Sequence, residues 1–126
     1  MATDTDKRRR ARLVDLCMSL PESERGKSGQ HMTFTVRGRA FAHYLDNHHA
    51  DGVIAVAARV PDGLNIALAD ASPQRYYLPE RLADRGWVGL RLDVMRVNWS
   101  EVEDLVTTSF VLTAPTQLAG RAAASG

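Results

Sequence analysis

Several features that would point directly to a function are scarce or missing in this sequence of 126 residues. Cys17 is the only cysteine, which excludes an internal disulfide and any zinc site built on cysteine pairs. No apolar run comes near the length of about 18 residues that a membrane-spanning helix needs. The basic start, MATDTDKRRRARLV, has no apolar segment behind it of the kind that a secretory signal needs. We therefore expect a cytoplasmic protein.

Motifs of the common enzyme classes are also missing. The sequence contains no G-x-x-x-x-G-K-[ST] phosphate loop, no G-x-G-x-x-G fingerprint and no G-x-S-x-G nucleophile elbow. An enzyme would need a polar pocket built from residues such as His31, His43 and Asp46, and no spacing brings these together. A histidine within a strand is more often a half-buried structural side chain than a general base. We expect no catalytic activity and no cofactor.

The stretch LDNHHADG at 45–52 raises the question of a metal site, because it sets two histidines between two aspartates. The adjacent residues His48 and His49 would point to opposite sides of an extended chain. Zinc needs three or four ligands at spacings such as H-E-x-x-H, which are missing here. Asp51-Gly52 is a strong turn dipeptide. We expect a hairpin loop, with a functional metal site as the minor alternative.

Lysine is scarce, with 2 residues against 14 arginines. The net charge is +1, and residues 1–12 carry five basic and two acidic side chains, so that the rest of the chain sums to −2. This distribution is not typical of a protein covered in basic surface for nucleic acid. An anionic partner would therefore have to be bound by a local patch.

Hydrophobic periodicity predicts the elements of the first half of the chain. Apolar residues at positions 13, 16, 17 and 20 recur at helical spacing and predict a helix over about 6–20, which Pro21 ends. The polar segment 21–30 is expected to be a loop. Alternation with a period of two predicts a hairpin over 31–45, with Gly38 at its turn.

Three further strands are predicted at 52–60, 64–69 and 87–93. The segment 72–86 fits either a short helix or an irregular crossing. A last helix is predicted from Ser100, which has the spacing of a capping box with Glu103. The segment PTQLAGRA adds one more short turn.

This order of elements predicts an α+β fold, in which an antiparallel sheet carries the N- and C-terminal helices on one face. The length fits a single domain over residues 1–126. The ends, about 1–6 and 122–126, are expected to be frayed.

Four segments together carry a family resemblance: HMTFTVRGRAFAHYLDNHHADG, RYYLPERLADRGWVGLRLD, VNWSEVEDLVTTSF and VLTAPTQLAG. They resemble the MmcQ/YjbR family of small bacterial proteins, over roughly residues 10–120. The most specific features are the GWVGLRLD strand, the tryptophan before the last helix and the AP-x-x-LA tail. Asn98 stands where relatives often have aspartate, and Thr116 and Gln117 stand where a basic residue often follows the proline.

The resemblance implies a CyaY-like (frataxin-like) α+β fold and the description "DNA-binding protein". The fold also suggests frataxin-like iron handling. Iron-binding frataxins present an acidic stripe on the first helix, however, whereas this helix begins DKRRRARLVD. We therefore do not expect iron delivery.

A DNA-binding function would use arginines of the first helix, of the hairpin tip VRGR and of the region after GWVGL to contact phosphates of double-stranded DNA. The candidate contacts are Arg8, Arg9, Arg10, Arg12, Arg37, Arg39, Arg91 and Arg96.

The alternative is a non-enzymatic module that binds a small molecule or a protein in a groove near Trp87, Tyr76 and Tyr77. Trp87 and Trp99 are equally typical of core anchors. The sequence alone does not decide between the two functions.

Overall fold

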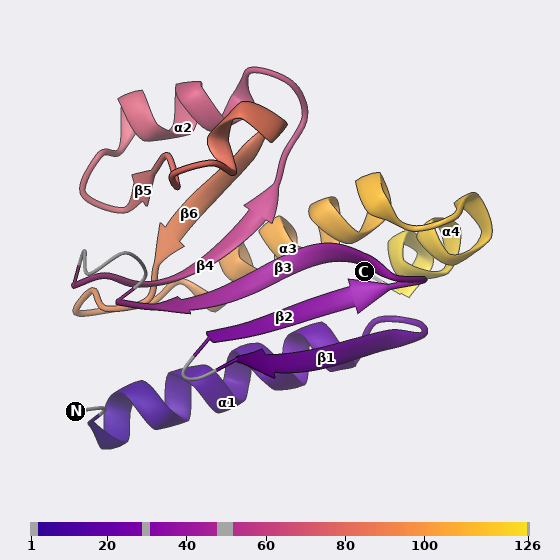
Figure 1. The fold of residues 1–126 in the computed structure, drawn as a ribbon, viewed down its shortest axis with the longest axis horizontal. Coiled ribbons are helices and arrows are strands. Elements are labelled where there is room, and N and C mark those ends of the chain that lie inside the picture. The colour runs from indigo at the N-terminus through magenta and orange to yellow at the C-terminus, as the bar shows by residue number, and fades with distance from the viewer. Residues whose placement is uncertain (1–2, 29–30, 48–51, 126) are drawn as a thin grey trace.

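The computed structural model describes residues 3–28, 31–47 and 52–125. One antiparallel sheet has the strand order β1-β2-β3-β4-β6-β5. Figure 1 looks onto the open face of this sheet, and the helices α1 (Asp4–Met18) and α3 (Trp99–Thr113) lie behind it. The predicted α+β fold, with its terminal helices on one face, is therefore confirmed. The strands are β1 (Ser23–Ser28), β2 (His31–Val36), β3 (Arg39–Asp46), β4 (Ile54–Arg59), β5 (Tyr76–Tyr77) and β6 (Trp87–Arg91).

Alternate side chains of the strands pack into two separate clusters. Tyr44 and Val56, which are partners across β3 and β4, belong to the main core together with Phe110 of α3. One position along the strand, Ala57 faces the opposite side and packs with Trp87 in a smaller cluster. The sheet is thus apolar on both faces at its centre, and the smaller cluster lies on the open face.

Both ends of the described chain are helical where fraying was predicted. Thr3 caps α1 through a capping box, in which its hydroxyl accepts from the Asp6 amide and the Asp6 carboxylate accepts from the Thr3 amide. At the other end, α4 spans Thr116–Ser125, where only a short turn was predicted. Leu118 and Ala122 are one helical turn apart, and both are buried in the core. Helices α1 and α4 thus extend into both segments for which frayed ends are predicted.

The segment 21–30 contains the edge strand β1, and its prediction as a loop is wrong. Its register runs from Ser23 opposite Val36 to Ser28 opposite His31. The exposed side chains of Glu24 and Arg25 give no apolar alternation by which to recognise a strand. Charged side chains are typical of edge strands, where they discourage pairing with other chains.

The segment LNIALA, predicted as a strand, forms the helix α2 (Leu64–Ala71). Gly63 precedes it with a φ of 83°, a conformation that glycine adopts without strain. The buried Asn65 side chain donates to the carbonyls of Ala83 and Trp87, which holds α2 against the start of β6. A short apolar run fits helix and strand equally well, and this tertiary contact decides between them.

The other predicted elements lie near their expected places. The β2–β3 hairpin turns at Arg37 and Gly38, both with positive φ, as a two-residue turn requires. The segment 72–86 contains β5 and the short 3-10 helix η2 (Ala83–Arg85). The cap of α3 differs from the prediction, because Asn98 rather than Ser100 caps the helix by accepting from the Glu101 amide. His48 and His49 lie outside the described residues.

Candidate functional site

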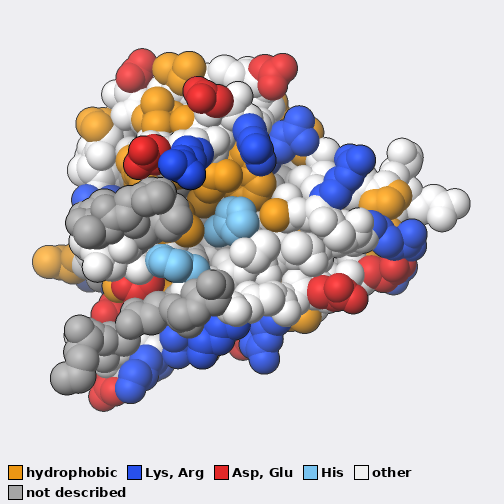
Figure 2. Space-filling view, in the orientation of Figure 1, with side chains coloured by type: hydrophobic (Ala, Val, Ile, Leu, Met, Phe, Trp, Pro, Cys, Tyr) orange, Lys and Arg blue, Asp and Glu red, His pale blue; other side chains and the backbone are white. Residues whose placement is uncertain are grey.

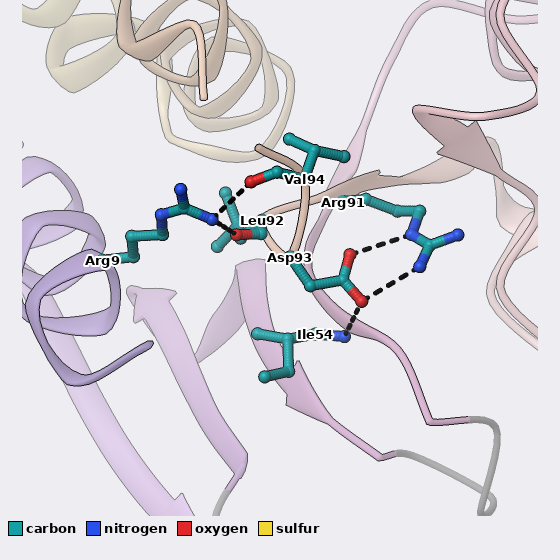
Figure 3. Close-up of polar contacts among 6 residues, drawn as sticks. All are labelled: Arg9, Ile54, Arg91, Leu92, Asp93 and Val94. Carbon is teal, nitrogen blue, oxygen red and sulfur yellow. Dashed lines mark hydrogen bonds and ion pairs between the residues drawn. The ribbon is translucent and has the colours of Figure 1, made fainter. Parts of the chain in front are cut away.

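The arginine run of α1 is partly committed to holding the fold together. One guanidinium nitrogen of Arg9 donates to the carbonyls of Leu92 and Val94 at 2.6 and 2.7 Å (Figure 3), and the other donates to Met95 at 3.1 Å. The guanidinium of Arg12 lies 4.7 Å from the ring centroid of Trp99. These contacts tie α1 to the loop after β6 and to the start of α3.

The other candidate arginines of α1, and those at and after the end of β6, differ in their contacts and exposure. Arg91 donates twice to the Asp93 carboxylate, which also accepts from the Ile54 amide (Figure 3). Partial burial opposes ionisation of Asp93, but these hydrogen bonds lower its pKa. Arg96 is exposed in the following loop. Arg8 and Arg10 lie on α1, the first exposed and the second half-buried.

The two arginines of the hairpin tip have different surroundings. Arg37 donates to both oxygens of Glu22, at 2.8 and 3.0 Å, and these hydrogen bonds lower the pKa of the Glu22 carboxyl. Arg39 is exposed and lines a hollow on the open face of the sheet.

That hollow is the arginine groove, a cavity of about 520 Å³. Figure 2 shows this face, where histidine and hydrophobic side chains lie near the middle and Lys and Arg side chains border them on the side toward α2 and α4. Three exposed arginines, from β3, β4 and η2, line the groove together with four apolar or aromatic side chains and a threonine. The lining residues are Arg39, Ala40, His43, Arg59, Leu82, Arg85, Trp87 and Thr113.

Strand pairing brings these residues together. Arg59 pairs with Trp87 across β4 and β6, so the two side chains leave the sheet on the same face. The buried Ser109 of α3 is hydrogen-bonded to the backbone of both β3 and β4 from the helix-covered face of the sheet. Its hydroxyl accepts from the Arg59 amide at 2.9 Å and donates to the Phe41 carbonyl at 2.5 Å. Ser109 thereby fixes the backbone of β3 and β4 beside the groove, near the irregularity in the β2–β3 register.

The aromatic part of the groove is also held in place. The ring of His43 lies 5.1 Å from that of Trp87, between centroids, at an interplanar angle of 32°. Nδ1 of His43 is 3.0 Å from the Thr33 hydroxyl. Trp87 is only 6% exposed, whereas His43 is partly exposed. Trp87 therefore supports the imidazole from within the smaller cluster.

The charge of the groove is of one sign. Among the described residues that line it, none is acidic. A neighbouring hollow of about 340 Å³ shares Arg39 and Thr113 with the groove and adds Arg37. Arg39 therefore lines both hollows, whereas the charge of Arg37 is paired with Glu22.

A family model, YjbR, matches residues 18–112. The chain belongs to the YjbR family. The matched range contains all the lining residues of the arginine groove except Thr113, and it leaves out most of α1. The family resemblance seen in the sequence is therefore confirmed.

Among solved structures, this YjbR-family chain is similar to the crystal structure of Deinococcus radiodurans protein DR2400, which is described by the family-model domain DUF419. The TM-score is 0.63 at 23% sequence identity, over 89% of this chain and 78% of that one. At this identity the similarity supports the fold alone. No curated protein matches the chain.

Three further observations concern metal ligands, membrane-spanning helices and the cysteine in the described part of this YjbR-family chain. No three His, Cys, Asp or Glu side chains among residues 3–28, 31–47 and 52–125 are grouped to hold a metal ion. Within the same ranges, no helix is both long and apolar enough to cross a membrane. Cys17 is buried in the core, and burial raises the pKa of its thiol, which disfavours the reactive thiolate.

The tyrosines named with Trp87 in the alternative hypothesis do not share a groove. Tyr76 is buried and donates from its hydroxyl to Glu101 at 2.5 Å, on the helix-covered face. Tyr77 lies on the open face, with its ring against Gly89. Of the three aromatic residues in that hypothesis, Trp87 lines the arginine groove.

Sequence reasoning missed Arg59 and Arg85 as site residues. Arg59 ends an apolar strand, and Arg85 lies in the segment 72–86, whose sequence fits either a short helix or an irregular crossing. The one available signal is that Arg59 has the same strand parity as Ala55 and Ala57, so all three point to one face. That signal gains meaning only once the neighbouring strands are known.

Proposed function

We propose that this YjbR-family chain is a DNA-binding protein that holds phosphates in the arginine groove. The observation that carries the proposal is the convergence of Arg39, Arg59 and Arg85, from three elements, on one hollow whose described lining includes no carboxylate. A guanidinium presents a rigid fork of donors that matches the oxygens of a phosphate, and it stays protonated at any physiological pH.

The main phosphate contact would then lie in the arginine groove and not on the first helix. Arg9 and Arg12 are engaged by backbone carbonyls and by an indole ring, so reaching a phosphate would cost these contacts. Arg37 would have to leave Glu22 in the same way. In this proposal the chain acts by binding, without a catalytic step.

The test is fluorescence anisotropy of a labelled random 20-nucleotide DNA, offered both as a single strand and as a duplex. If three phosphates are neutralised, affinity should fall between about 50 and 200 mM salt by about 40-fold for a duplex and about 20-fold for a single strand. A triple variant with Arg39→Gln, Arg59→Gln and Arg85→Gln should lose most of the binding and most of the salt dependence.

A matched control removes the same charge elsewhere. Arg8, Arg25 and Arg96 are exposed, and their triple glutamine variant should bind nearly as well as the unchanged chain. The proposal fails if neither form of DNA binds at low salt, or if the control variant loses as much affinity as the groove variant. The second result would return the contact to the basic start of α1 and the loop after β6.

A further inference from the structure

The arginine groove has a floor that phosphates alone do not require. Ala40, Leu82 and Trp87 provide apolar surface, and the imidazole of His43 lies beside them. We infer that the groove takes a single strand of DNA and holds one unpaired base against the His43 ring while the arginines bind the flanking phosphates. This inference rests on the proposed function and adds the form of DNA that is bound.

The His43 ring is prepared as a stacking platform. Trp87 supports it at 5.1 Å between centroids, and Thr33 fixes its rotation through Nδ1 at 3.0 Å. A ring held in place in this way loses little conformational entropy when a base stacks on it. Stacking of bases on aromatic side chains, within a positively charged groove, is the usual mode by which proteins bind single strands.

A duplex would leave this floor unused. The faces of its bases are covered by their stacked neighbours, and its outer surface offers phosphates and sugars. Reading a duplex through its major groove takes a helix or a two-stranded ribbon that enters the groove. Here the lining residues surround a concavity of about 520 Å³, a size that suits a ligand on the scale of a nucleotide.

A second ring, that of Tyr77, lies on the same face of the sheet. Residues paired in register across the sheet lead from His43 through Ala57 and Gly89 to Tyr77. Between the two rings Ala57 is fully buried, and the Tyr77 ring packs against Gly89. The Tyr77 ring lies so close to Gly89 that a Cβ there would be 2.4 Å from its nearest atom. At the usual strand spacing, the row spans about 14 Å from β3 to β5.

The inference is tested by comparing three labelled DNA probes on the full chain at low salt. They are a 20-nucleotide single strand, its duplex, and the same strand with abasic sites in place of the bases. The unchanged chain should bind the single strand more tightly than the duplex. It should bind the abasic strand about tenfold more weakly than the normal strand, although both carry the same phosphates.

Two substitutions locate the base. His43→Ala should weaken binding of the normal strand about tenfold and leave binding of the abasic strand nearly unchanged, because only the stacked base is lost. His43→Phe keeps an aromatic ring and should restore most of the affinity. Thermal unfolding of each variant verifies that it is folded.

Failure of the inference is distinct from failure of the proposed function. If the abasic strand or the duplex binds as tightly as the normal single strand, the inference is overturned while DNA binding by the arginines stands. If His43→Ala weakens the normal and abasic strands equally, His43 is not the platform. If no probe binds, or the triple arginine variant binds like the unchanged chain, the proposed function itself fails.

Discussion

Replacing Arg9 tests whether this arginine stabilises the fold or contacts DNA. Its guanidinium donates to three carbonyls of the loop after β6, and the two shortest of these hydrogen bonds are partly buried. In Arg9→Met the apolar stem is kept, but the carbonyls of Leu92 and Val94 lose a charged donor. Each partly buried carbonyl left without a partner costs about 1–2 kcal/mol, while the exposed carbonyl of Met95 can turn to water.

The expected loss is therefore about 2–4 kcal/mol of unfolding free energy, a large share of the 5–15 kcal/mol typical of a domain. With a urea m-value of about 2 kcal/mol/M, the unfolding midpoint should fall by about 1–2 M. Tryptophan fluorescence reports this transition, because Trp99 packs beside α1. Arg8→Met, at an exposed position of the same helix, should change stability by less than about 0.5 kcal/mol.

DNA affinity, measured under conditions where Arg9→Met is fully folded, should remain close to that of the unchanged chain. The reasoning is refuted if Arg9→Met is as stable as Arg8→Met and yet binds DNA less well. Arg9 would then be a contact residue, and its hydrogen bonds to the loop would contribute little to stability.

Two further outcomes follow from buried polar contacts. Ser109→Ala leaves the Arg59 amide and the Phe41 carbonyl without their partner, and should lower the unfolding free energy by about 2–4 kcal/mol in urea titration; a loss below about 0.5 kcal/mol would show that water replaces the hydroxyl. Burial opposes ionisation of Glu101, but hydrogen bonds from Tyr76 and Arg75 lower its pKa below 4.5. Its contribution to stability is therefore present above about pH 4.5 and is lost as the pH falls through the lowered pKa. Glu101→Gln should remove this part of the acid dependence of stability. Unfolding measured from pH 3 to 7 would detect the difference.

Elements with a clear hydrophobic period were predictable from the sequence, because one apolar face determines both their type and their orientation. The β2–β3 hairpin and α3 are of this kind: the core side of α3 is given by Val102, Val106 and Phe110. Hydrophobic periodicity did not predict β1 and α2. β1 is held by backbone pairing at a polar edge, and α2 is positioned by the side chain of one buried asparagine, Asn65.

The candidate site was predictable only in part, for a related reason. Arg39 was identified because a hairpin tip is visible in sequence. Arg59 and Arg85 were missed because their convergence depends on β6 pairing next to β4, a neighbourhood that skips β5. Conversely, the arginine run of α1 is conspicuous in sequence, but two of its members face the loop after β6 and the ring of Trp99. Local charge density therefore gave a poor guide to which arginines are available.

Net charge is an equally poor guide for this chain. Outside residues 1–12 the charges sum to −2, which at first sight opposes binding of a polyanion. At physiological salt, however, charges more than about 8 Å away are largely screened. A phosphate in the arginine groove is therefore affected mainly by the guanidinium groups of Arg39, Arg59 and Arg85, while more distant carboxylates contribute little. The groove offers three guanidinium groups, so the proposed binding should be modest in strength and should weaken as salt rises.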